Sequence, residues 1–176
     1  MENLITLEIN GIEVQVPPGT SILNAAKKVH VKIPTLCYHP DLTPWAACGI
    51  CIVRAVGSPK LLRACCTEVA PGMKIVTHDP EIVKIRRSVL ELMLSTHPND
   101  CLQCPRNGNC ELQKIAADFG IRDNPYPNRF EPLPRDETTP SIVLNPEKCI
   151  KCGRCALVCQ NMQNVWALEF IGRGEK

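Results

Sequence analysis

The stretch CYHPDLTPWAACGIC, from Cys37 to Cys51, decides the fold of the first part of this 176-residue chain. Its three cysteines are spaced C-x10-C-x2-C, and Cys65 or the adjacent Cys66 can complete a set of four. Four thiolates are what a [2Fe–2S] cluster requires. Cysteines two residues apart sit on a tight turn and can point both sulfurs at one metal centre, whereas a disulfide between them would be strained. We therefore expect an iron–sulfur site in this loop.

The residues on either side of the loop predict a small sheet with one helix. Residues 3–16 alternate around Asn10-Gly11, a strong two-residue turn signal, and so predict a β-hairpin. A helix is expected over 21–29, capped by Thr20 or Ser21. Further strands are expected at 50–56, 61–64 and 74–77. Two hairpins around one helix, with a metal-binding loop between them, form the β-grasp pattern.

Two further groups of ligand-type residues follow. One is spaced H-x3-C-x2-C-x5-C and consists of His97, Cys101, Cys104 and Cys110. The other is spaced C-x2-C-x2-C-x3-C and consists of Cys149, Cys152, Cys155 and Cys159. Helices are predicted on both sides of the first group, over 79–95, which Asp79-Pro80-Glu81 begins, and over 110–119. The longer helix carries a predicted apolar stripe of Ile82, Ile85, Val89, Leu92 and Met93.

The last cysteine group is expected to be incomplete. In two-cluster ferredoxins the first three cysteines of such a run hold one cluster, and the fourth serves the other. Cys149, Cys152 and Cys155 then lack a fourth ligand, and Cys159 belongs to a cluster whose remaining ligands are absent. We expect from this that a longer protein has been truncated. The alternatives are a natural stop and a single [4Fe–4S] cluster held by all four cysteines.

Composition restricts the class of protein. The chain has twelve cysteines, and a disulfide-rich secreted protein is the alternative reading of that number. The start, MENLITLEIN, lacks the apolar segment of a signal peptide, so we expect a reducing cytoplasm and metal ligation. A net charge of +2 without basic clusters argues against nucleic acid as a partner. No apolar run approaches the ~20 residues of a membrane-spanning helix.

Four motifs carry a resemblance that extends over nearly the whole chain. They are Ile33-Pro34-Thr35-Leu36-Cys37-Tyr38-His39, Cys48-Gly49-Ile50-Cys51, His97-Pro98-Asn99-Asp100-Cys101 and Cys149-Ile150-Lys151-Cys152-Gly153-Arg154-Cys155. With them the chain resembles the N-terminal iron–sulfur module shared by [FeFe]-hydrogenases, the large peripheral-arm subunit of complex I and NAD(P)-linked formate dehydrogenases. The motif that contains His97 is the most specific, since the last motif alone would indicate only a ferredoxin.

The resemblance implies a ligand for each open position. The stretch Leu61-Leu62-Arg63-Ala64-Cys65 resembles the end of complex-I-type [2Fe–2S] domains, which makes Cys65 the fourth ligand and leaves Cys66 a spare thiol. His97 with Cys101, Cys104 and Cys110 resembles the family's [4Fe–4S] site with one histidine and three cysteines. Zinc is the chemical alternative there, because the same ligand types suit it.

The expected fold is of the α+β class, and four segments are predicted. They are a β-grasp [2Fe–2S] ferredoxin domain (1–78), a small helical [4Fe–4S] domain with one His and three Cys ligands (79–120), an extended proline-rich linker (121–140) and a partial bacterial-type ferredoxin domain (141–176). In the last domain we expect short strands at 141–145 and 166–171 and a helix over 152–161.

The function that the resemblance implies is electron transfer with no catalytic residue in this stretch. The favoured setting is a cytoplasmic NAD(P)-linked [FeFe]-hydrogenase complex, including the electron-bifurcating type. Its implied partners are a diaphorase subunit that carries FMN and binds NAD(P), a small thioredoxin-like [2Fe–2S] subunit, and ferredoxin. No glycine-rich loop that could cradle phosphates occurs in the sequence, so this stretch is not expected to bind nicotinamide or flavin itself, and the resemblance implies that the diaphorase partner binds FMN and NAD(P). The alternatives are a formate dehydrogenase, a complex-I-type NADH dehydrogenase and a stand-alone carrier.

Overall fold

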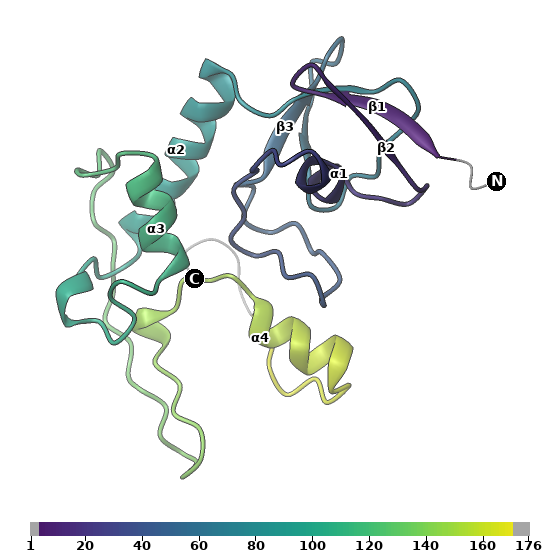
Figure 1. Cartoon of the computed structure of the whole chain (residues 1–176). Coiled ribbons are helices and arrows are strands. Elements are labelled where there is room, and N and C mark those ends of the chain that lie inside the picture. Colours follow the sequence, from purple (N-terminus) through teal and green to yellow (C-terminus); the bar gives the residue numbers. More distant parts are fainter. Residues whose placement is uncertain (1–3, 171–176) are drawn as a thin grey trace. The chain divides into compact units, whose positions relative to one another are not determined.

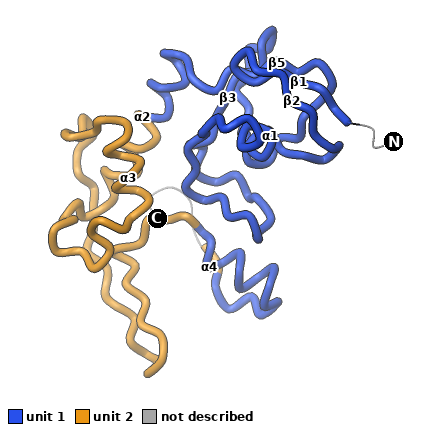
Figure 2. The backbone as a smooth tube through the Cα atoms, viewed as in Figure 1, with its two compact units in different colours: residues 1–86, 153–168 blue, residues 87–152, 169–176 orange. Residues whose placement is uncertain are grey.

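The computed structural model describes residues 4–170. It divides into two compact units (Figure 2). Unit 1 contains the chain up to residue 86 together with residues 153–168, and unit 2 contains residues 87–152 together with the described residues from 169. Each unit is described by itself below. Within residues 4–170, no helix combines the length and the apolar character that a membrane crossing requires.

A β-hairpin opens unit 1, as predicted. Strands β1 (Ile5–Ile9) and β2 (Ile12–Val16) pair antiparallel, with Ile9 opposite Ile12 at the turn (Figure 1). Asn10 and Gly11 both have positive φ, 51° and 83°, which is the backbone that a two-residue type I′ turn demands.

Three more strands complete a five-stranded sheet. They are β3 (Ile52–Ala55), β4 (Leu61–Arg63) and β5 (Lys74–Val76), and the order across the sheet is β2-β1-β5-β3-β4. Strands β1 and β5 pair parallel, and the other pairs are antiparallel. The predicted β-grasp arrangement is therefore present, with both hairpins joined into one sheet.

Helix α1 (Ile22–Lys28) supplies the second layer of unit 1. Ser21, one of the two expected caps, accepts a hydrogen bond at Oγ from the Asn24 backbone N–H at 3.2 Å. The inner face of the helix is buried in a core shared with the sheet. Buried members of this core include Leu7, Ile9, Val16, Ile22, Leu23, Ala25, Ala26, Val53 and Ile75.

Helix α2 (Pro80–Ser95) begins where it was predicted to begin. Asp79 accepts the Ile82 N–H at Oδ1, at 2.8 Å, and so caps the helix. The buried face differs from the predicted apolar stripe, because Leu92 is 51% exposed while Ile82, Arg86 and Leu90 are buried. These three residues are four apart and lie on one side of the helix, so an arginine occupies the middle of a buried stripe.

Helix α3 (Glu111–Asp118) packs within unit 2 through Leu112, Ile115 and Ala116. The helix ends at Asp118, and Gly120, the expected stop signal, follows two residues later with φ +62° and a backbone N–H that donates to the Ala117 carbonyl at 2.9 Å. Two short 3-10 turns flank the unit's cysteine-bearing loops, at Cys101–Gln103 and Pro146–Lys148.

The predicted strand at 141–145 is wrong. Among residues 121–145 the structure has no strand and no helix, only an isolated antiparallel bridge in which Asp136 and Leu144 exchange two hydrogen bonds of 2.9 Å. One bridge cannot extend into a ladder here, because Pro140 just before this segment has no N–H to donate and the neighbouring residues are exposed.

The C-terminal predictions are confirmed only in part. Helix α4 (Arg154–Leu157) continues as a π-helical turn over Val158–Met162, and it starts after Gly153, whose φ of +73° is left-handed. The strand predicted at 166–171 is wrong for 166–170, and residue 171 lies outside the described range. The N–H of Ala167 donates to Cys159 Sγ at 3.1 Å, so this segment folds back on the preceding turn and pairs with no strand.

Candidate iron–sulfur sites

The loop between α1 and β3 carries three of the four cysteines of the first predicted set. Cys37 and Cys51 are buried and Cys48 is half-buried, and Cys65, 2% exposed, follows β4. Gly49 lies between Cys48 and Cys51 with φ +71°, so a residue without Cβ relieves the strain of this turn. The loop and the sheet edge thus bring the four predicted residues into one neighbourhood of unit 1.

The thiols of the first set interact in two pairs. A hydrogen bond between the Cys37 and Cys48 sulfurs lowers the pKa of Cys48 to about 5 and raises the pKa of Cys37. A hydrogen bond between Cys65 and Cys51 likewise lowers the pKa of Cys51 to about 7 and raises that of Cys65. Two sulfurs therefore ionise readily beside two buried thiols, and thiolates are the form that binds iron.

Cys66 points away from this group. It is exposed, and its Sγ lies 3.6 Å from the Arg63 carbonyl oxygen. The geometry therefore supports Cys65 rather than Cys66 as the residue that faces the other three cysteines.

The second predicted set lines one cavity of about 130 Å³ in unit 2. Its walls include His97, which follows the last turn of α2, the three cysteines of the set, and also Lys148 and Ile150. The cysteines are Cys101 at the start of a 3-10 turn, Cys104 at its end and Cys110 at the start of α3. Four helix ends, contributed by α2, the 3-10 turn and α3, thus position four ligand-type side chains around one space.

The surroundings of His97 favour the neutral imidazole. Burial lowers its pKa, and the positive charge of Lys148 lowers it further. Its Nδ1 accepts the Asn99 backbone N–H at 3.4 Å, and the Lys148 carbonyl also approaches the ring. The lone pair of the neutral ring lies on Nδ1, which accepts the long Asn99 contact here, so an iron bound at Nδ1 would replace that contact while the other ring nitrogen donates to the Lys148 carbonyl and fixes the tautomer.

An ion pair borders the same cavity. Lys148 Nζ binds Asp100 Oδ2, and these residues directly precede Cys149 and Cys101. The second and third motifs are therefore tied together at their first cysteines.

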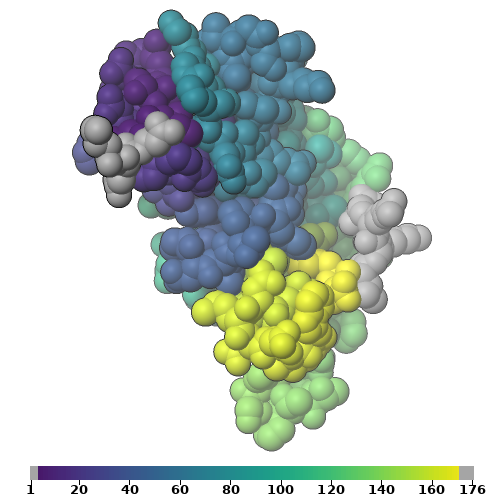
Figure 3. Space-filling model, turned by 90° about the vertical axis from the view of Figure 1, so that its right-hand side faces the viewer, coloured from purple at the N-terminus to yellow at the C-terminus, as the bar shows by residue number. Residues whose placement is uncertain are grey.

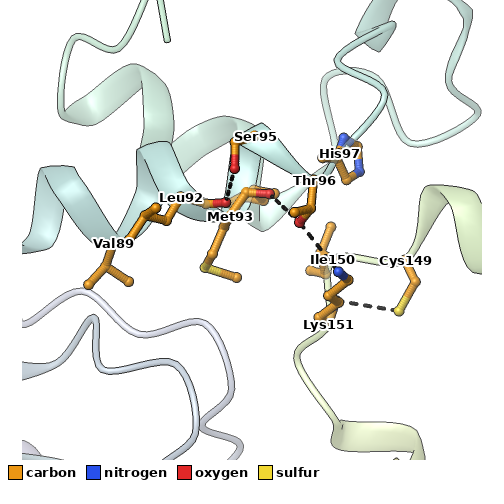
Figure 4. A pocket seen from close by; sticks show the side chains of 10 residues that line it. Val89, Leu92, Met93, Ser95, Thr96, His97, Cys149, Ile150 and Lys151 are labelled. Carbon is orange, nitrogen blue, oxygen red and sulfur yellow. Dashed lines mark hydrogen bonds between the residues drawn. The ribbon is translucent and has the colours of Figure 1, made fainter. Parts of the chain in front are cut away.

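A larger cavity, of about 380 Å³, adjoins the end of α2 (Figure 4). Lys151 reaches across it, and its Nζ donates to Thr96 Oγ1 at 3.3 Å. The backbone N–H of Lys151 donates to Cys149 Sγ at 3.3 Å. These contacts hold the first part of the third motif beside the residues that precede His97.

The third predicted set is divided between the two units. Cys149 and Cys152 belong to unit 2, and Cys155 and Cys159 belong to unit 1. Cys155 is exposed and Cys159 is buried, so the two cysteines of α4 and its π-helical turn have different surroundings.

Residues 153–168 lie against the cysteine loop of the first set, within unit 1 (Figures 2 and 3). Arg154 Nη2 donates to the Leu36 carbonyl at 2.6 Å, next to Cys37. A Cβ placed on Gly153 would lie 1.9 Å from Cζ2 of the Trp45 ring, so the ring sits directly on the glycine.

Within the described residues, no group of three or more His, Cys, Asp or Glu side chains closes around a single metal ion. The ligands of an iron–sulfur cluster bind different irons and so stand further apart than the ligands of one ion. The shared cavity of the second set and the paired thiols of the first suit such clusters.

Sequence reasoning missed two charged features, Arg86 in α2 and the Lys148–Asp100 ion pair. A signal existed for Arg86, because it is four residues from both Ile82 and Leu90. A signal also existed for the ion pair, because both partners directly precede a ligand-type cysteine.

Three family models match the chain in succession. Residues 2–80 match a 2Fe-2S iron-sulfur cluster binding domain, and residues 86–125 match the NADH-ubiquinone oxidoreductase-G iron-sulfur binding region. Residues 142–162 match a 4Fe-4S binding domain. The chain therefore contains binding domains for both [2Fe–2S] and [4Fe–4S] clusters.

Curated relatives are similar over nearly the whole chain. The NADP-reducing hydrogenase subunit HndD of Solidesulfovibrio fructosivorans is 38% identical over 98% of the chain, which covers 30% of that protein. An NADH-quinone oxidoreductase subunit of Rhizobium meliloti is 34% identical over 97% of the chain and 20% of the relative. The NADPH-Fe(3+) oxidoreductase subunit alpha of Geobacter sulfurreducens is 33% identical, with 98% and 20% covered. The chain thus spans a third or less of the length of these relatives.

A solved structure has the same fold. A chain in the crystal structure of an NAD+-reducing [NiFe]-hydrogenase in the H2-reduced state aligns with a TM-score of 0.89 and 27% identity. The alignment covers 97% of this chain and 72% of that one.

Proposed function

We propose that the chain passes electrons within a larger NAD(P)-linked oxidoreductase. The chain belongs to the iron–sulfur modules that an NADP-reducing hydrogenase subunit and an NADH-quinone oxidoreductase subunit share. One observation carries the proposal. His97, Cys101, Cys104 and Cys110 line a single cavity, in a region that matches an oxidoreductase iron–sulfur binding region.

Each of the first two sets of residues would bind one cluster. Cys37, Cys48, Cys51 and Cys65 would hold the [2Fe–2S] cluster, and His97 with three cysteines would hold a [4Fe–4S] cluster. When bound, such clusters accept and donate single electrons. Burial of Cys37, Cys51 and Cys65 would limit the access of water to the cluster on the side of these three ligands. The neutral imidazole of His97 replaces one thiolate, so the cluster with its ligands would be one unit less negative than at an all-cysteine site. The lower negative charge would raise the reduction potential of the cluster.

The third set is proposed to bind ferredoxin-type [4Fe–4S] clusters. Cys149, Cys152 and Cys155 would serve one cluster, and Cys159 would serve another. The match of residues 142–162 to a 4Fe-4S binding domain supports cluster binding by this segment.

The proposed setting is the [FeFe]-hydrogenase subunit of a cytoplasmic NAD(P)-linked complex. The similarity to an NADP-reducing hydrogenase subunit supports it. FMN and NAD(P) would lie on a diaphorase subunit, with a small thioredoxin-like [2Fe–2S] subunit and ferredoxin as further partners. A complex-I-type NADH dehydrogenase is the second candidate, which the similarity to the NADH-quinone oxidoreductase subunit of Rhizobium meliloti favours.

Cluster content tests the electron-transfer proposal directly. The chain purified without oxygen is expected to contain one [2Fe–2S] and at least one [4Fe–4S] cluster, because two ligand sets are complete. Iron and sulfide analysis, with EPR spectra of the reduced protein, measures this. Stoichiometric zinc with only two irons per chain would contradict a [4Fe–4S] cluster at the His97 site.

The setting is tested on the native complex, purified through a tag on this chain. H2-dependent reduction of NAD(P)+ is the expected activity. Quinone reduction by NADH without hydrogenase activity would favour the complex-I-type alternative, and bound molybdenum or tungsten would favour a formate dehydrogenase.

A further inference from the structure

Arg86 is a charged side chain in the interior of unit 1. It is 4% exposed and lies between Ile82 and Leu90 on the buried face of α2. Its Nη2 donates to the Ile52 carbonyl oxygen at 2.5 Å. Ile52 directly follows Cys51, so the guanidinium is held at the strand that leaves the first cysteine loop.

The described residues provide Arg86 with no carboxylate partner. Its Nε is buried and has no hydrogen-bond partner among them. The other buried charged residue of the described chain, Glu91, is paired, since it accepts from Arg87 Nε at 2.8 Å. Asp79, the carboxylate that contributes to the pKa of Arg86, is already paired with Arg54 at 3.0 Å. A buried charge without a counter-charge is strongly unfavourable, so this position calls for an anion.

The first cysteine set is where that anion would be. Burial lowers the pKa of Arg86 to about 10, and the thiolate of Cys51 is the foremost group that opposes this change. The guanidinium is held on the carbonyl of Ile52, the residue next to the proposed ligand Cys51, and so lies within the electrostatic reach of that sulfur. A cluster held by four thiolates carries net negative charge, and one-electron reduction adds another negative charge.

We infer that Arg86 is a positioning residue that compensates the charge of the [2Fe–2S] cluster held by Cys37, Cys48, Cys51 and Cys65, and that it raises the reduction potential of that cluster. The inference rests on the proposed function, because it needs a cluster at the first site. A fixed cation stabilises the reduced cluster more than the oxidised one, since the reduced cluster is one charge more negative.

Potentials of the cluster-loaded chain test the inference. EPR-monitored redox titrations compare wild type with Arg86→Met, Arg86→Lys and Arg87→Met. Arg86→Met removes the charge and is expected to lower the [2Fe–2S] potential, with a shift in the reduction equilibrium on the order of tenfold, which is 59 mV for one electron. Arg86→Lys keeps the charge and is expected to restore most of that shift.

Arg87→Met is the matched control. Arg87 is the adjacent arginine of the same helix, but it is 44% exposed and paired with Glu91. Its loss is expected to leave the [2Fe–2S] potential unchanged. The EPR signal of the [4Fe–4S] cluster is identified as the one whose potential falls in a His97→Cys variant. The potential of that cluster is expected to stay the same in all three arginine variants.

The possible outcomes distinguish a failure of the Arg86 inference from a failure of the proposed electron-transfer function. An unchanged [2Fe–2S] potential in Arg86→Met would overturn the inference and leave the proposed function intact. An equal loss of cluster in Arg86→Met and Arg86→Lys, with no shift in the potential that remains, would show a purely structural contact with Ile52 and would also overturn it. A wild-type chain without a [2Fe–2S] signal would contradict the proposed function itself.

Discussion

Cys65 and Cys66 are neighbours in sequence with different surroundings. Cys65 is 2% exposed and hydrogen-bonds to Cys51, whereas Cys66 is exposed and lies beside the Arg63 carbonyl. Both lie in a turn that follows β4, where the backbone N–H of Cys66 donates to the Arg63 carbonyl at 3.2 Å, and this turn buries Cys65 and exposes Cys66.

We predict that Cys65→Ser removes most of the [2Fe–2S] EPR signal and that Cys66→Ser keeps nearly all of it. Each substitution replaces a thiol by a hydroxyl of similar size, so the two variants serve as controls for each other. Iron content and the visible spectrum of the purified proteins check the result. Loss of signal in Cys66→Ser alone would mean that the other neighbour binds the iron.

Single residues were predictable where their chemistry is local. The spacing of Cys37, Cys48 and Cys51 predicts a metal-binding loop without any knowledge of the fold. Arg86 could not be assigned in the same way, since an arginine in a helix is usually solvated. The spacing of Ile82, Arg86 and Leu90 places the arginine on an apolar face, but only the folded structure shows that it is buried and donates to the Ile52 carbonyl.

At the level of elements, the junction between β3 and α2 depends on one carboxylate. Asp79 caps α2 through the Ile82 N–H and also accepts from Arg54 Nε of β3 at 3.0 Å. The N–H of Ile82, and then Arg54, lower the pKa of Asp79 below its ordinary value. The helix cap and the strand are thus joined by the same ionised group.

This lowered pKa predicts how stability depends on pH. The contribution of Asp79 is fully present above the ordinary carboxyl pKa of about 3.9, and it is lost as the pH falls through the lower pKa of the folded state. Asp79→Ala is therefore expected to lower Tm by a few degrees at neutral pH. The difference from wild type should shrink in acid below about pH 4.

Thermal unfolding followed by circular dichroism at several pH values measures this difference. Asp123→Ala is the control, because Asp123 is exposed in the segment without helix or strand. A Tm difference for Asp79→Ala that stays constant into acid would show that the carboxylate charge does not contribute.

Elements were predictable where local signals agree. Asn10-Gly11 gave the first hairpin, and Asp79-Pro80-Glu81 gave the start of α2. The strands expected at 141–145 and 166–170 are absent because a strand needs a neighbour to pair with, and sequence alternation does not provide one. Asp136 pairs with Leu144 only once, and the N–H of Ala167 is used by Cys159.

At the scale of the whole chain, residues 153–168 return to the unit formed by the first 86 residues. No local pattern predicts this return, because the contacts join residues more than a hundred positions apart. Arg154 donates to the Leu36 carbonyl, and Gly153 lies under the Trp45 ring. The third motif is thereby attached to the loop that carries the first predicted ligands.

The Trp45 contact yields the last prediction. An added Cβ at Gly153 would lie 1.9 Å from Trp45 Cζ2, so the ring must move away from the third motif in Gly153→Ala. Such overpacking costs about 1–3 kcal/mol. Gly72→Ala is the control, because Gly72 has a similar φ, +70° against +73°, but nothing lies within 4 Å of its added Cβ. Backbone strain is thus matched and only the clash differs.

Trp45 fluorescence in a Trp166→Phe background is expected to shift in Gly153→Ala and not in Gly72→Ala, since these are the only two tryptophans. Limited proteolysis is expected to cut within residues 153–168 faster in Gly153→Ala. Equal effects of the two glycine substitutions would attribute the change to backbone strain, and the Trp45 ring would then not hold the third motif to the first loop.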